Sequence, residues 1–124
     1  MTTITEARTL IAGAVSSAGV ECSPYAPDSL IAPAAYVEGV DVDYTGTGWT
    51  FCGTGTAQAR VVACAQRNDR AGGMQMLEDL APGVMTALEA VDGVRVMSVG
   101  SGEADIGGQT LPAIMWTVQF VLGQ

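Results

Sequence analysis

Histidine and lysine are both absent from this 124-residue sequence. Without histidine the chain has no Ser-His-Asp triad, no Cys-His pair, no His-ligated zinc and no imidazole to act as a pH switch. Cysteine is scarce: Cys22, Cys52 and Cys64 form no CxxC motif, and an odd number argues against a disulfide framework. These absences exclude most familiar hydrolase and metalloenzyme chemistry, and they predict buried, reduced thiols and no cofactor.

Positive charge is also scarce. Five arginines face 13 acidic residues, which gives a formal net charge of −8. Such a chain repels phosphate backbones, so sequence-independent binding of DNA or RNA is disfavoured. The start lacks a basic segment followed by an apolar one, and no apolar run reaches the roughly 18 residues of a membrane span. We therefore expect a soluble, intracellular protein with no membrane contact.

Charged residues of both signs make up only 15% of the chain, against roughly 25% in an average globular domain. The length fits one domain over residues 1–124, with a core large enough to need no disulfide. Two interpretations of the low charge stay open. The protein is either a small domain with a neutral surface or a subunit that buries much of its exterior against copies or partners.

Hydrophobic periodicity predicts an α+β domain, with one mixed or mostly antiparallel sheet packed by two helices. Pro82 lies inside the second helix and should kink it near Leu80. Gly39 interrupts a strand and indicates a bulge. We expect helices at 4–18 and 74–90, strands at 20–23, 34–44, 58–66, 94–99 and 111–122, and loops at 68–73 and 100–110.

The apolar pattern also predicts the core. The strand at 58–66 is apolar on both faces, which places it centrally in a sheet or on a subunit interface. The second helix has an apolar stripe at helical spacing. By pattern most methionines are core filler, namely Met74, Met76, Met85, Met97 and Met115.

Two acidic pairs are the candidates for chemistry. Asp41 and Asp43 share one face of a strand and could hold Ca²⁺ or Mg²⁺, although a solvated strand face explains them equally well. Glu103 and Asp105 form a similar pair in the expected loop. Three glycine-rich segments, 46–48, 53–55 and 100–102, match no phosphate-binding motif and are typical of turns.

Other polar and aromatic residues are typical of interfaces. Arginines at the end of a buried strand suit bidentate pairing with carboxylates of a neighbouring subunit, although a solvated loop is the alternative. Two aromatic residues flank a glycine turn and could anchor a partner. The interface candidates are Tyr44, Trp49, Arg67, Asp69, Arg70, Glu103 and Asp105.

Nearly the whole chain resembles the tail-terminator proteins of long-tailed bacteriophages, particularly the small ones carried by phages of actinobacteria. The resemblance includes the opening helix, the final apolar strand and three passages. These are Gly-Val-Glu-Cys-Ser-Pro-Tyr-Ala-Pro-Asp at 19–28, Ala-Pro-Ala-Ala-Tyr-Val at 32–37 and Leu-Glu-Ala-Val-Asp-Gly-Val-Arg-Val at 88–96.

The resemblance implies a structural virion protein and not an enzyme. Such proteins form a ring, commonly of six subunits, at the head-proximal end of the tail tube. There they stop tube polymerisation and present a surface to the head connector. The implied partners are copies of the chain, the tail-tube protein and the head-completion protein, with DNA passing through the channel unbound. The implied location is the tail–head junction, after assembly in the host cytoplasm.

Other functions also fit parts of the sequence. A related neck or tail-tube component would share the α+β style. A small metal- or ligand-binding α+β domain would use Asp41, Asp43, Glu103 or Asp105 and needs a concave pocket with convergent carboxylates. A stand-alone regulatory dimer predicts two subunits.

Overall fold

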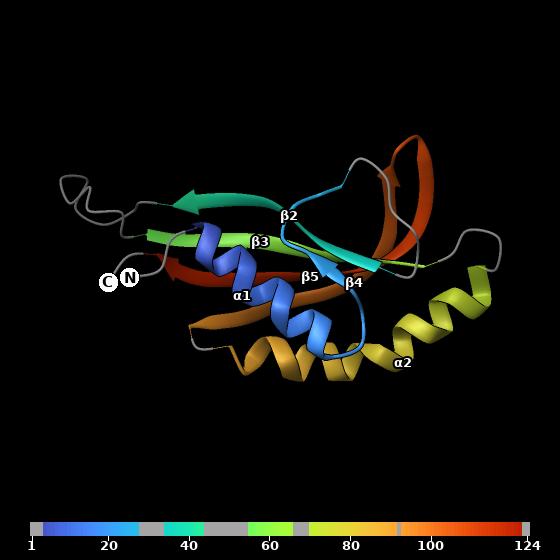
Figure 1. The fold of residues 1–124 in the computed structure, drawn as a ribbon, viewed down its shortest axis with the longest axis horizontal. Coiled ribbons are helices and arrows are strands. Elements are labelled where there is room, and N and C mark those ends of the chain that lie inside the picture. The colour runs from blue at the N-terminus through green and yellow to red at the C-terminus, as the bar shows by residue number, and fades with distance from the viewer. Residues whose placement is uncertain (1–3, 28–33, 44–54, 66–69, 92, 123–124) are drawn as a thin grey trace.

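The computed structural model describes residues 4–27, 34–43, 55–65, 70–91 and 93–122 (Figure 1). These residues form two helices and one five-stranded sheet with the strand order β1-β2-β3-β5-β4. The elements are α1 (Ile4–Ser17), β1 (Cys22–Ser23), β2 (Ala34–Asp43), β3 (Gly55–Cys64), α2 (Arg70–Glu89), β4 (Val94–Ile106) and β5 (Gln109–Leu122). Strand β1 pairs parallel to β2 and the other pairs are antiparallel, so the predicted α+β fold with a mixed sheet is confirmed.

The main hydrophobic core lies between the helices and one face of the sheet. Alternate residues of β3 and β5 supply the sheet side of this core, because side chains alternate between the two faces of a strand. The central place predicted for the strand at 58–66 is confirmed, since β3 lies in the middle of the order and is buried on both faces. The large, fully buried members from the helices are Ile11, Val15, Leu77, Val84 and Leu88.

Arg8 connects α1 with the start of the sheet through hydrogen bonds to the backbone. One guanidinium nitrogen donates hydrogen bonds to the carbonyl oxygens of Pro24, at 2.7 Å, and Val37, at 3.0 Å. The guanidinium carbon also lies 4.5 Å from the centroid of the Tyr25 ring, a cation–π contact. Gly19 follows the end of the helix with a φ of 107°, a conformation that residues with a Cβ rarely adopt.

A second, smaller cluster covers part of the opposite sheet face. Ala104, Ile106 and Leu111 from the far end of the β4–β5 hairpin pack with Tyr36 and Val62 of the central strands. In Figure 1 this end of the hairpin curves away from α2. The hairpin therefore folds part of its own length over the face that the helices leave open.

The loop predicted at 100–110 is wrong, because β4 extends to Ile106 and β5 begins at Gln109. Gly107 and Gly108, with φ of 58° and 81°, form the two-residue connection, as expected for a hairpin whose turn needs positive φ at both positions. The glycines upstream obscured the alternation of acidic and apolar residues that ends at Ile106. Glu103 and Asp105 consequently lie on a strand.

The loop predicted at 68–73 is also wrong in part, since α2 begins at Arg70 and includes two glycines near its start. Glycine costs a helix only about 1 kcal/mol relative to alanine, and burial of Leu77, Val84 and Leu88 further along offsets this cost. The two halves of α2 run in different directions in Figure 1, which agrees with the predicted kink near Pro82. The bulge at Gly39 is confirmed by the register shift between Glu38 and Asp41.

Two methionines predicted to fill the core are exposed. Met76 on α2 and Met97 on β4 have exposed fractions of 37% and 47%. Met97 lies where the register of β4 against β5 shifts, so it has no direct cross-strand partner. Met74, Met85 and Met115 do pack against the two clusters.

Replacement of Ile106 by alanine should lower the free energy of unfolding by about 2–3 kcal/mol, because the side chain is buried against Tyr36 and Val62. Asp105→Ala, at the exposed neighbouring position, should change it by less than about 1 kcal/mol through loss of the bond from Thr110. Urea unfolding measures both values. Equal effects would contradict the packing of this hairpin.

Candidate functional site

Four of the interface candidates from the sequence, Tyr44, Trp49, Arg67 and Asp69, lie outside the described residues. Arg70 is the first residue of α2. Their interface role therefore stays a prediction.

The two acidic pairs lie apart in the described part of the chain, although Glu103 and Asp105, two residues apart on β4, share one face of that strand. Asp41 is exposed on β2, whereas Glu103 and Asp105 are exposed on β4. Two strands separate β2 from β4, a spacing of about 14 Å across the sheet. Asp105 accepts a 2.6 Å hydrogen bond from the hydroxyl of Thr110. The described residues include no group of three or more potential metal ligands, so they bring together no carboxylate site.

The sheet face opposite the helices is polar beyond the hairpin cluster. Arg60 on β3 forms an ion pair with its cross-strand partner Glu38 on β2. A shallow hollow of about 210 Å³ beside this pair is also lined by Asp41, Gln58 and Thr117. Both partners of the pair are solvent-accessible, and an exposed pair of this kind contributes about 0–1 kcal/mol. The arrangement is that of a wet face of an antiparallel sheet.

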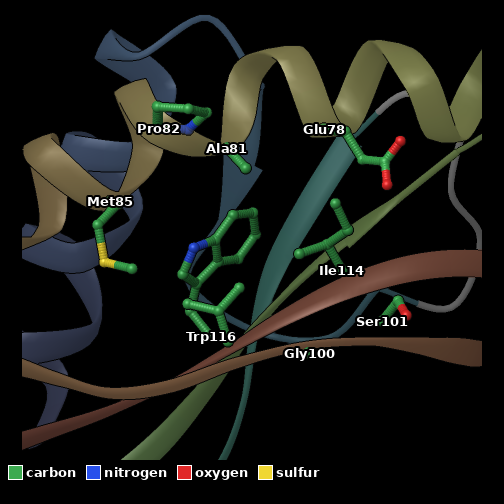
Figure 2. Close-up of a pocket in the computed structure, with 9 residues that line it drawn as sticks. Glu78, Ala81, Pro82, Met85, Gly100, Ser101, Ile114 and Trp116 are labelled. Atoms are coloured by element: carbon green, nitrogen blue, oxygen red, sulfur yellow. The ribbon is translucent and has the colours of Figure 1, made fainter.

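A larger hollow lies between α2 and the β4–β5 hairpin, with a volume of about 430 Å³. Figure 2 shows Trp116 and Ile114 extending from β5 toward the helix, with Ala81 facing them. We call this hollow the α2–β4 groove. The residues that line it are Glu78, Ala81, Pro82, Met85, Val99, Gly100, Ser101, Ile114 and Trp116.

Trp116 leaves one polar atom of the groove unsatisfied. Its side chain is buried, with an exposed fraction of 1%, and its Nε1 has no hydrogen-bond partner among the described residues. The nitrogen lies on the side of the ring that faces Met85 (Figure 2). An unsatisfied buried donor costs about 1–3 kcal/mol, so Nε1 favours any occupant that supplies an acceptor.

On the helix side of the groove, α2 lacks one backbone hydrogen-bond donor. Pro82 has no N–H and cannot donate to the carbonyl of Glu78, four residues earlier in α2. Glu78 and Pro82 both line the groove. The groove is therefore apolar overall, with one unmatched donor, Trp116 Nε1, on the sheet side.

The groove adjoins the outer edge of the sheet. Strand β4 is last in the strand order, and no strand among the described residues pairs with its outer edge. Val99, 43% exposed, lies on this strand and lines the groove, and Met97 is two residues earlier. A long edge strand with exposed apolar side chains is a template for pairing with another chain.

The buried thiol of Cys64 is not arranged as a nucleophile. Burial raises its pKa to about 11, with a smaller contribution from the charge of Glu38. Burial likewise raises the pKa of Tyr36, which packs in the same cluster, to about 12, and that of Cys22 to about 12. Thiols that stay protonated at neutral pH are unreactive. Of the two described cysteines, both free, Cys64 is buried and Cys22 is partly buried.

Comparison with known proteins identifies no relative: no protein-family model and no curated protein sequence matches the chain. Neither helix among the described residues is long and apolar enough to cross a membrane. The assignment of function therefore depends on the chain's own chemistry.

The sequence does not predict the groove. Pro82 by itself predicts only a kink, and Trp116 is one residue of the final apolar strand. The available signal was a proline in an apolar helix together with a tryptophan in the final strand. Nothing in the sequence places these two residues opposite each other, because their contact depends on how α2 lies across the sheet.

The free energy of unfolding should fall as pH rises above about 9. In this range the Cys64 thiol ionises in the unfolded chain, whereas burial keeps it protonated in the folded chain up to a pKa of about 11. Cys64→Val removes this contribution, so its free energy of unfolding should fall less than that of the unmodified chain between pH 8 and pH 11. Urea unfolding at both pH values tests this. An identical fall in both proteins would contradict the burial of the thiol.

Proposed function

We propose that this protein is a structural subunit that acts through its surfaces, assembling into a ring of the phage tail-terminator kind. The observation that carries the proposal is the outer edge of β4, with which no described strand pairs, together with the exposed side chains of Met97 and Val99 beside the apolar groove. Apolar side chains gathered at such a sheet edge favour binding to another protein of the assembly. Among its lining residues the α2–β4 groove has a single carboxylate, from Glu78, and so lacks the convergent pair that acid–base chemistry uses.

Composition and fold class support the same proposal. A charged fraction of 15% suits a subunit whose exterior is partly buried in an assembly. The α+β fold is of the style that related neck and tail-tube proteins share. In the proposed ring, neighbouring copies pack side by side, and other surfaces meet the tail-tube protein below and the head connector above. The net negative charge would let DNA pass through the centre unbound.

The rival function, a carboxylate-based metal- or ligand-binding domain, is less well supported. It needs a concave pocket with convergent carboxylates, whereas the described residues include no group of three or more potential metal ligands. A related neck or tube component stays an alternative, because it would use the same kinds of surface. The symmetry and partners of the native particle would distinguish these possibilities.

Ring closure should be promoted by salt. Six copies carry a formal charge of −48, six times the −8 of one chain, and their repulsion opposes assembly. Raising NaCl from about 0.01 M to about 1 M shortens the Debye length from about 30 Å to about 3 Å, which should shift the population toward the ring. Sedimentation velocity measures this shift.

The control is MgCl₂ at matched ionic strength. Equal promotion by both salts indicates general screening, whereas a larger effect of MgCl₂ indicates cation binding at the subunit boundary. A monomer at every salt concentration would contradict the proposed ring. A ring equally stable at the lowest ionic strength would contradict the role given to charge.

A further inference from the structure

We propose that the α2–β4 groove binds an extended, basic segment of another protein, which adds to the sheet along the outer edge of β4. This inference goes beyond ring formation, because it concerns a different partner and holds whether or not the chain forms a ring. It is based on the shape of the groove, its unsatisfied polar atom and its charge.

The outer edge of β4, which no described strand pairs with, favours an extended strand as the occupant. Beyond the register shift at Met97, β4 runs regularly from Ser98 to Ile106 against β5, so its outer edge presents a regular row of backbone groups. A strand added to such an edge gains backbone hydrogen bonds, and its alternate side chains point to one face. The side chains of the added strand that lie next to Val99 and Ser101 would enter the groove, since both of these residues line it.

The unsatisfied polar atom of the groove favours a peptide over a purely apolar ligand. Trp116 Nε1 needs an acceptor, because this buried donor has no hydrogen-bond partner among the described residues. A peptide supplies a carbonyl and an N–H within each residue, whereas an acyl chain supplies neither. Met85, which lies beside Nε1 in Figure 2, has an unbranched side chain that rearranges at low cost to admit the acceptor.

The charge of the groove identifies the kind of segment. Glu78 lines the groove, and Figure 2 shows its carboxylate below α2 on the side of the sheet. Ser101 joins the groove to a neighbouring hollow of about 260 Å³ that includes Glu103 and Met74. No arginine is among the described residues that line either hollow. An apolar side chain flanked by basic ones therefore complements this surface.

A second copy of the chain complements the α2–β4 groove poorly. The chain has no lysine, and the described strands carry only Arg60 and Arg95. Arg60 is already paired with Glu38 across β2 and β3. A copy would also bring a net charge of −8 to an acidic rim. The occupant is therefore assigned to a different, basic protein.

The probe is a fluorescent peptide of about eight residues, an ordinary strand length. It has a central leucine, a lysine two residues to either side and threonine elsewhere. Residues two apart lie on one face about 7 Å from each other, so the leucine can enter the groove while the lysines lie near its rim. The matched peptide has glutamate in place of each lysine.

Fluorescence polarisation should show saturable binding of the lysine peptide that weakens with salt, and at least about tenfold weaker binding of the glutamate peptide. Ser101→Phe fills the groove and should weaken binding by at least about tenfold. Ser98→Phe is the matched control, because Ser98 pairs with Thr117 on the same strand but faces away from the groove, and it should bind normally. Glu78→Gln should bind the lysine peptide several-fold more weakly without filling the groove.

The indole N–H resonance of Trp116, identified with Trp116→Phe, should move on addition of the lysine peptide as Nε1 gains an acceptor. Equal binding of both peptides, normal binding by Ser101→Phe, or no binding at about 1 mM would overturn the proposal. Loss of self-association in Ser101→Phe without peptide binding would instead assign the groove to a second copy. Peptide binding by a chain that forms no ring would overturn only the proposed function.

Discussion

The ten-residue ladder between β3 and β5 is the constraint on which the rest of the structure depends. These two strands are central in the sheet, and their alternate residues supply both hydrophobic clusters. One face receives the helices and the other receives the folded-over end of the β4–β5 hairpin. Because other parts of the chain pack on both faces of this ladder, the surface that we propose for protein binding lies further out, at β4 and the groove beneath α2.

The position of this surface connects the fold with the proposed function. Strand β4 is long enough to pair with β5 along its inner edge, yet its outer edge has no strand partner among the described residues. Pro82 bends α2 near the place where the helix passes over Trp116. The bent helix and the tryptophan of β5 therefore line the same groove. Protein binding at such a place requires no catalytic residue, which fits a chain without histidine.

The sequence predicted the parts of the fold that depend on local periodicity and failed where glycine was frequent. The helix at Ile4–Ser17, the bulge at Gly39 and the central strand were confirmed because their signals are short-range. The segment at 100–110 was read as a loop, although Ala104 and Ile106 alternate with acidic residues as in a strand. Pairing with β5 stabilises this strand, and a long-range pairing of that kind leaves no trace in a local pattern.

The candidate site was less predictable than the fold. Acidic pairs drew attention because carboxylates have recognisable chemistry, but Asp41 and Asp105 lie on separate parts of the sheet. The groove consists of residues that each have an ordinary structural explanation, and only their arrangement in space distinguishes them. Trp116 is the clearest example, since its unsatisfied nitrogen becomes evident only when its surroundings are known.

The central claim is that this chain functions as an assembled ring, and negative-stain electron microscopy of the purified protein at high salt tests it most directly. The account predicts ring-shaped particles with an open centre, and class averages with sixfold symmetry. Compact particles no larger than a dimer under the same conditions, with no open centre, would contradict it.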